Sequence, residues 1–127
     1  MHPWANILYV CGGVWHALNV LVTGATGFTG GHLARSLAAR GYDVAALVRD
    51  RERAASLVDA GVSLRVGDLR DKAALERAAA GREVVYHIAA IYRQGGLRDE
   101  EYRAVNAASV ASVIEAAAAA GVRRVVH

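Results

Sequence analysis

A run of closely spaced glycines, Thr23–Gly30 (TGATGFTG), has the clearest chemical capacity in the sequence. It lies between a β-branched apolar run and a segment of helical periodicity, where such a turn can bind the pyrophosphate of a dinucleotide. Gly24 allows a tight turn, Gly27 allows the backbone to approach a phosphate without an intervening Cβ, and Gly30 allows close helix packing. The helix N-terminus adds unpaired N–H groups and a positive dipole end. The turn predicts a dinucleotide site, the alternative being a glycine-rich βα turn without a ligand.

Arg49 and Asp50 follow the next apolar run, at about the distance where dinucleotide-binding enzymes discriminate between cofactors. If Arg49 is the first residue after the strand, its guanidinium can bind the 2′-phosphate of NADP in a bidentate way. If the register shifts by one residue, Asp50 takes that place and NAD is favoured. A third alternative is that Asp50 caps the following helix and the arginines are solvated.

The elements that must position these residues alternate regularly along the chain. Short apolar runs predict strands, and apolar residues at helical spacing between them predict helices that each end at a glycine. The predicted strands are Val20–Thr23, Val44–Val48, Val62–Val66, Val84–Ile88 and Val122–Val126. This alternation is typical of right-handed βαβ crossovers onto a parallel sheet that is covered on both faces. We expect an α/β fold of the Rossmann type: a doubly wound parallel sheet of five strands in the order 3-2-1-4-5, truncated after the fifth strand.

The glycine-rich turn and three further segments resemble the extended short-chain dehydrogenase/reductases, which include NAD(P)-dependent epimerases, dehydratases and dihydroflavonol-reductase-like enzymes. Gly67–Asp71 (GDLRD) resembles the family's segment after the third strand, whose Asp, here Asp68, holds the adenine amino group. Residues 86–90 (YHIAA) resemble the segment that lines the nicotinamide-side ribose. Residues 102–106 (YRAVN) resemble the long-helix segment whose Asn supports the active-site helix geometry. The resemblance extends over about residues 19–127.

The resemblance implies that the chain binds NAD(P). Reductase-like members carry an Arg at the position of Arg49, and this favours NADP(H), with NAD as the alternative. The expected cofactor-binding residues are Gly24, Thr26, Gly27, Phe28, Thr29, Gly30, Arg49, Asp50, Asp68, Leu69, Ala89, Ala90 and Asn106.

Each of these assignments outside the turn has a structural alternative. Asp68 could cap the helix that follows it, and the two alanines could serve tight packing alone. Asn106 could be an exposed helix residue. His87 is expected to be a hydrogen-bonded core histidine rather than a catalyst, and Tyr102 to serve packing.

The residues that perform the family's chemistry are absent from the sequence. That chemistry uses a Ser or Thr after the fifth strand and a Tyr-xxx-Lys pair, in which Lys lowers the pKa of the Tyr general base. The only lysine is Lys72, and the residue four positions before it is Asp68. No catalytic residue is therefore assigned, and the chain alone is expected to be inactive.

The leading hypothesis is the cofactor-binding portion, or fragment, of an epimerase, dehydratase or reductase that acts on a sugar nucleotide or a small hydroxy or keto compound. Such a substrate would bind only to a full-length enzyme. One alternative is a non-catalytic NADP(H)-binding sensor or interaction module, and another is a structural relic without a ligand site.

Composition excludes several other classes of protein. A chain of 127 residues that is 54% hydrophobic and 21% charged suits one domain with a core and is too apolar for a disordered chain. Cys11 is the single cysteine, which excludes an internal disulfide, leaves no Cys/His metal cluster and favours a reducing, cytoplasmic location. Net charge is +3, but basic and acidic residues alternate, so no nucleic-acid site is expected.

The first 34 residues contain no Lys, Arg, Asp or Glu. Polar residues interrupt their apolar stretches and no positive region precedes them, so neither a membrane span nor a signal peptide is expected. Residues 1–18 are expected to be an appendage of unknown role, with Ile7–Val10 able to form a short strand. Residues 19–127 are expected to form a partial NAD(P)-binding domain.

The fifth predicted strand would leave an apolar sheet edge uncovered. Such an edge predicts self-association. The N-terminal stretch, with Trp4, Trp15 and Ile7–Val10, is a candidate cover for it.

Overall fold

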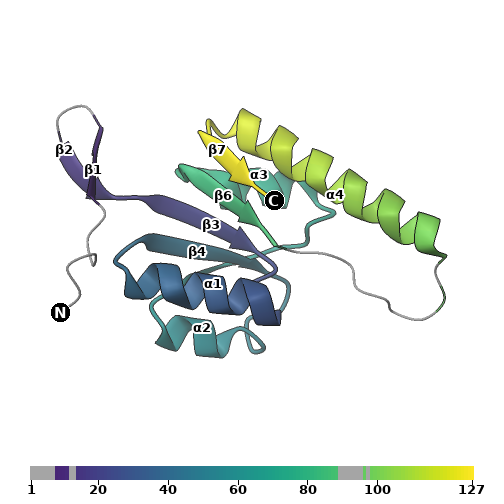
Figure 1. The fold of residues 1–127 in the computed structure, drawn as a ribbon, viewed down its shortest axis with the longest axis horizontal. Helices are drawn as coiled ribbons and strands as arrows, with labels where there is room; N and C mark the ends of the chain where they lie inside the picture. The colour runs from purple at the N-terminus through teal and green to yellow at the C-terminus, as the bar shows by residue number, and fades with distance from the viewer. Residues whose placement is uncertain (1–7, 12–13, 89–95, 97) are drawn as a thin grey trace.

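The computed structural model describes residues 8–11, 14–88, 96 and 98–127. Its main sheet has five parallel strands in the spatial order β5-β4-β3-β6-β7. Figure 1 labels β4, β3, β6 and β7 of this sheet. The strands are β3 (Asn19–Thr23), β4 (Asp43–Val48), β5 (Ser63–Val66), β6 (Val84–His87) and β7 (Arg124–Val126). Counted within this sheet the order is 3-2-1-4-5, so the predicted Rossmann-type topology is confirmed.

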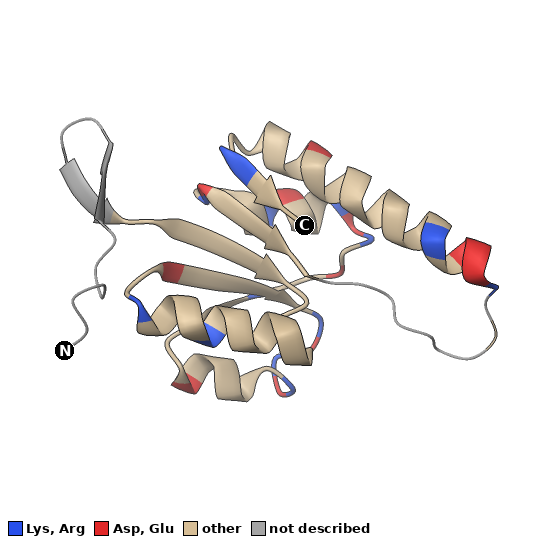
Figure 2. Cartoon of the chain, viewed as in Figure 1, with Lys and Arg blue, Asp and Glu red and all other residues tan. Residues whose placement is uncertain are grey.

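In the described part of the chain, four helices cover the two faces of the sheet. They are α1 (Phe28–Ala39), α2 (Ala55–Asp59), α3 (Lys72–Ala79) and α4 (Asp99–Ala119). α1 and α2 lie on one face, and α3 and α4 lie on the other (Figure 1). Charged residues concentrate at helix ends and in the connecting turns, whereas the middle of the sheet carries almost none (Figure 2). This is the distribution expected for a parallel sheet that is buried on both sides.

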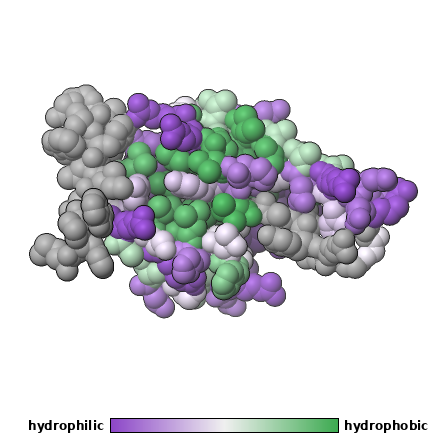
Figure 3. Space-filling model, viewed as in Figure 1, coloured by the Kyte–Doolittle hydropathy of each residue, from purple (hydrophilic) through white to green (hydrophobic). Residues whose placement is uncertain are grey.

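The strand residues alternate between two apolar cores. Val20 and Val22 of β3 belong to the core beneath α1 and α2, whereas Leu21 between them belongs to the core beneath α3 and α4. β3 is the central strand, because Val20 pairs with Val44 on one side and with Val84 on the other. Figure 3 shows apolar side chains gathered over the middle of the face in view, with hydrophilic side chains around them.

The chain leaves every one of these helices through a glycine with positive φ, between 74° and 89°. Only glycine adopts this conformation readily, and it lets the next N–H groups bond to the last helical carbonyls. After α4, the N–H of Val122 donates to the carbonyl of Ala117 at 2.9 Å. After α2, the N–H of Val62 donates to the carbonyl of Leu57 at 3.0 Å. Because the N–H groups of these two valines bond to helix carbonyls, β7 and β5 begin after them, later than predicted.

Residues before β3 form a separate antiparallel hairpin of β1 (Leu8–Cys11) and β2 (Val14–Ala17). The sequence predicted a strand here but not its partner. The hairpin is a sheet of its own and adds no strand beside β7. Cover of that edge by the N-terminal stretch stays a prediction. Trp4 lies outside the described residues, as does the side chain of Trp15. Self-association through β7 stays a prediction.

Within the described residues, no helix is both long and apolar enough to cross a membrane.

Candidate cofactor-binding site

The glycine-rich turn connects β3 to α1 at the carboxyl edge of the sheet. Gly24 has a φ of +74°, and its carbonyl accepts a hydrogen bond from the N–H of Gly27 at 3.1 Å. Gly27 is the N-cap of α1, so no side chain covers the first N–H groups of the helix. The first turn of α1 also carries no acidic residue. These free N–H groups and the uncompensated dipole suit an anionic ligand such as a pyrophosphate.

Close backbone contact between α1 and the turn depends on two consecutive glycines. A Cβ at Gly30 would overlap the carbonyl oxygen of Gly24 and lie 2.6 Å from its carbonyl carbon. A Cβ at Gly31 would lie 2.8 Å from the carbonyl oxygen of Ala25. Gly27 is less constrained, at 3.3 Å from the Gly24 oxygen. The role of Gly31 was missed from sequence, although the doubled glycine was a visible signal.

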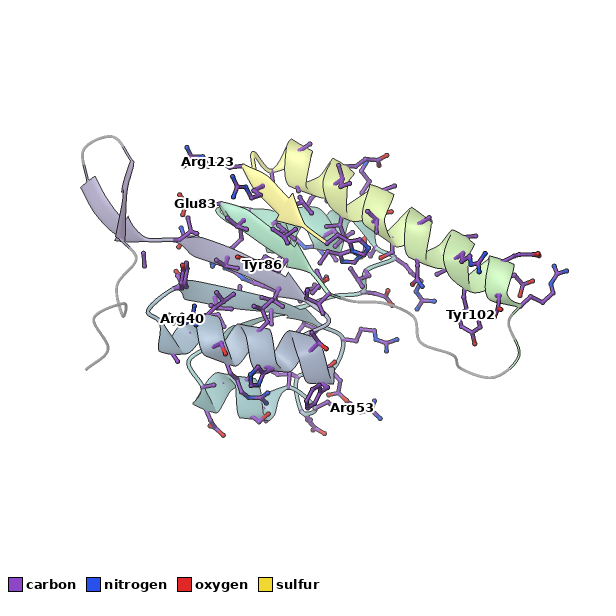
Figure 4. All side chains as sticks on the ribbon, in the orientation of Figure 1. Arg40, Arg53, Glu83, Tyr86, Tyr102 and Arg123 are labelled. Carbon is purple, nitrogen blue, oxygen red and sulfur yellow. The ribbon has the colours of Figure 1, made fainter. Side chains whose placement is uncertain are left out.

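Arg49 is the first residue after β4, which ends at Val48. The carboxylate of Asp50 accepts from the N–H of Glu52 at 2.9 Å and lies 3.9 Å from Nε of Arg53. Asp50 therefore caps the turn that precedes α2. Of the arrangements left open by the sequence, the structure has Arg49 as the first residue after β4. The Asp50 carboxylate is hydrogen-bonded within the turn that follows. Figure 4 shows Arg53 at this same end of the sheet, beside the start of α1.

Asp68 lies just beyond the carboxyl end of β5 and is bound by Arg70. Its carboxylate accepts from the Arg70 guanidinium, at 2.8 Å from Nη2 and 3.1 Å from Nε, and from the Arg70 backbone N–H at 2.9 Å. These bonds lower the pKa of Asp68 to about 2, with a smaller contribution from the charge of Arg49. Asp68 is therefore an ionised acceptor at neutral pH, which suits an exocyclic amino group.

The N-cap of α3 is Asp71, not Asp68. The Asp71 carboxylate accepts from the backbone N–H groups of Ala73 and Ala74 at 3.1 and 3.3 Å. The structural alternative for Asp68, a helix cap, is therefore wrong. Gly67 was not expected to matter by itself, but a Cβ there would lie 2.8 Å from the Cβ of Ala74. It lets α3 start close beneath the end of β5.

The other expected contact residues differ in their surroundings. Thr26 and Thr29 are exposed in the turn, and Phe28, at 94% exposure, is the most exposed large apolar side chain among the described residues. Leu69 packs against the core beneath α3 and α4. Asn106 is half-buried on α4, so it is not the fully exposed helix residue of the structural alternative. Ala89 and Ala90 lie outside the described residues.

His87 is a buried, hydrogen-bonded histidine, as expected. It is 2% exposed, and its Nδ1 and Nε2 lie 2.7 Å from Oγ1 of Thr23 and 3.1 Å from Oγ of Ser109. His127 stacks on it with 5.4 Å between ring centroids. Burial lowers the pKa of His87, and the nearby charge of His127 lowers it further. The imidazole is therefore neutral at neutral pH.

We expect acidification to reduce the free energy of unfolding, with full stability above about pH 6.5, the ordinary pKa of histidine. Below that value the unfolded chain protonates His87 while the folded chain keeps it neutral, so the unfolded state binds more protons and gains stability. Denaturant titrations between pH 8 and pH 5 measure this slope.

The control for this slope is the exposed His32. His87→Gln should flatten the pH dependence, because glutamine does not titrate, and His32→Gln makes the same substitution at an exposed site for comparison. An equal slope in the wild type and in His87→Gln would show that other groups carry the dependence.

No group of three or more His, Cys, Asp or Glu residues in the described part of the chain is arranged to hold a metal ion.

Comparison with known proteins agrees with this geometry. The sequence model of the NAD dependent epimerase/dehydratase family matches residues 20–127. Sterol demethylase protein B of Methylococcus capsulatus is 41% identical over 111 residues, which are 87% of this chain and 34% of that protein. The chain spans about a third of the length of the curated relatives it matches.

Two solved structures with bound dinucleotides share the fold. Triphenylmethane reductase from Citrobacter sp., complexed with NADP(H), has a TM-score of 0.64 and 31% identity over 84% of this chain and 35% of that one. A short-chain dehydrogenase/reductase superfamily protein from Agrobacterium tumefaciens, with bound NAD, has a TM-score of 0.67 and 30% identity over 84% of this chain and 30% of that one. Because the family's sequence model covers residues 20–127, which include the glycine-rich turn and all of the main sheet but Asn19, the chain belongs to the NAD dependent epimerase/dehydratase family, within the extended short-chain dehydrogenase/reductases.

Proposed function

We propose that residues 19–127 form the dinucleotide-binding part of an NADP(H)-dependent reductase, epimerase or dehydratase, with residues 1–18 as an appendage. The observation that carries the proposal is the glycine cradle between β3 and α1, where a Cβ at Gly30 would overlap the Gly24 backbone. The absence of a Cβ here lets α1 begin directly against the turn, so that its first N–H groups, which no side chain caps, can face a pyrophosphate. The side chains of Thr26 and Thr29 are exposed beside it and can donate to phosphate oxygens.

The adenosine half would lie across the ends of β4 and β5. Asp68, held ionised by Arg70, would accept from the adenine amino group, with Leu69 beside it. Arg49 would bind the 2′-phosphate, since it is the first residue after β4 and Asp50 is engaged with the Glu52 backbone. A guanidinium matches phosphate geometry better than any other side chain, and this supports NADP(H) over NAD.

When bound, a nicotinamide cofactor supplies hydride transfer. The chain's own residues would orient it, with Ala89, Ala90 and Asn106 toward the nicotinamide half. None of the five tyrosines is followed four residues later by a lysine, so the 127 residues lack the pair that moves the proton. We propose that this chain binds the cofactor without turning over a sugar nucleotide or a small hydroxy or keto compound.

Calorimetric titration of the purified 127-residue chain with NADPH and with NADH tests the proposal. We expect saturable binding of both, tighter for NADPH, and competition by 2′,5′-ADP that exceeds competition by 5′-AMP. Those two nucleotides differ in the phosphate that Arg49 would bind. A cooperatively folded sample that binds neither cofactor would overturn the proposed function.

A further inference from the structure

Thr23, His87 and Ser109 form one hydrogen-bonded chain through the interior of the molecule. Thr23 is fully buried and His87 nearly so, and the two hydroxyl oxygens lie 2.7 and 3.1 Å from the two ring nitrogens. The three residues come from β3, β6 and α4. One imidazole therefore joins three elements that are distant in sequence.

Both ends of this series of hydrogen bonds adjoin the candidate cofactor site. Thr23 is the last residue of β3 and directly precedes Gly24, whose carbonyl accepts from the N–H of Gly27. Ser109 lies three residues after Asn106 on α4, so the two share one face of the helix. A shift of α4 along the sheet would be transmitted through these hydrogen bonds to Thr23, the residue at which the glycine-rich turn starts.

We propose that His87 is a positioning residue for cofactor binding, because its buried imidazole fixes the glycine-rich turn relative to α4. The proposal rests on the proposed function of the turn. A neutral imidazole has one donor and one acceptor, and a hydroxyl can complement either. Removing one hydroxyl leaves a buried ring nitrogen without its partner, and one hydrogen bond instead of two then fixes the orientation of the ring.

Hydroxyl and imidazole groups of the described residues face His87. Thr23 of β3 and Ser109 of α4 contribute hydroxyls, and His127 after β7 contributes a titratable group, stacked on the ring and with Nδ1 3.2 Å from the His87 carbonyl oxygen. A protonated imidazole has two donors and no acceptor, so any hydroxyl that donated to it would have to turn. Variants at Ser109 avoid this complication and test the link at neutral pH.

The experiment titrates the full chain with NADP⁺ at pH 7.5 and measures amide hydrogen exchange at Gly27. We expect Ser109→Ala to raise the Kd for NADP⁺ by about threefold to tenfold, the worth of one hydrogen bond. It should also speed exchange of the Gly27 N–H, which donates to the Gly24 carbonyl within the turn. Ser109→Thr keeps the hydroxyl and should restore both values.

Two variants on the same helix separate positioning from general stability. Ser112→Ala removes a hydroxyl one turn away, and Val113→Ala removes buried apolar volume from the core beneath α3 and α4. Val113→Ala should lower the Tm but leave the Kd unchanged, and Ser112→Ala should change neither.

The proposal is overturned if Ser109→Ala keeps the wild-type Kd and Gly27 exchange rate, or if Val113→Ala weakens binding as much. A wild-type chain that does not bind NADP⁺ refutes the proposed function and, with it, a role for His87 in cofactor binding. The Gly27 exchange rate would then still report separately whether α4 and the turn are linked.

Discussion

Gly30→Ala is expected to abolish measurable NADPH binding and to lower the free energy of unfolding by about 1–3 kcal/mol, the usual cost of overpacking. The added Cβ would overlap the Gly24 carbonyl oxygen and lie 3.1 Å from the backbone nitrogen of Ala25. Because these are backbone atoms at the start of a buried turn, they cannot rotate away as a flexible side chain would. The turn must open, and the N–H groups of α1 then lose their alignment. Guanidinium titration and calorimetry with NADPH measure the two effects.

The matched control is Ser36→Ala, in the same helix but remote from the turn. It should leave the Kd for NADPH unchanged and the free energy of unfolding within about 0.5 kcal/mol of the wild type. If Gly30→Ala behaved like Ser36→Ala in both measurements, the close contact between α1 and the turn would not be needed for binding.

Much of the fold could be predicted because its signals are local. The central strands β4, β3 and β6 each contain a short apolar run, and each helix ends at a glycine that the turn geometry requires. The glycine-rich turn can likewise be recognised from consecutive residues, since its geometry depends on the absence of Cβ atoms within one turn of helix. A parallel sheet then follows from the alternation of these elements.

The partners of polar side chains could not be predicted in the same way. Whether Asp68 or Asp71 caps α3 depends on a shift of three residues in where the helix begins, and both carry the same side chain. The engagement of Asp50 with the Glu52 N–H likewise depends on where β4 ends. Sequence pattern locates such ends only to within a few residues.

The buried contacts of His87 depend on tertiary structure alone. Thr23 is 64 residues from it and Ser109 is 22 residues from it, on different elements. Burial and hydrogen bonding of the ring were predictable from its place at the end of an apolar strand. The identity of its partners required the register between β3 and β6, which pairs Thr23 directly with His87.

Arg49→Ala is expected to raise the Kd for NADPH by about tenfold to hundredfold and the Kd for NADH by less than about threefold. A hydrogen bond to a charged group contributes about 1.5–3 kcal/mol, and only NADPH carries the 2′-phosphate that would receive it. Calorimetric titration of each variant with each cofactor gives the ratio of the two Kd values. That ratio, rather than either Kd alone, reports discrimination between the two cofactors, because general damage to the site weakens the binding of both equally.

Arg51→Ala and Asp50→Ala complete the comparison. Arg51 is an exposed cation two residues further along, so its removal tests whether general positive charge is sufficient. It should leave the ratio unchanged. Asp50→Ala should also leave it nearly unchanged, since this carboxylate is engaged with the Glu52 N–H. If Asp50→Ala instead weakened NADH selectively while Arg49→Ala changed neither cofactor, the leading position after β4 would belong to the acid and NAD would be the cofactor.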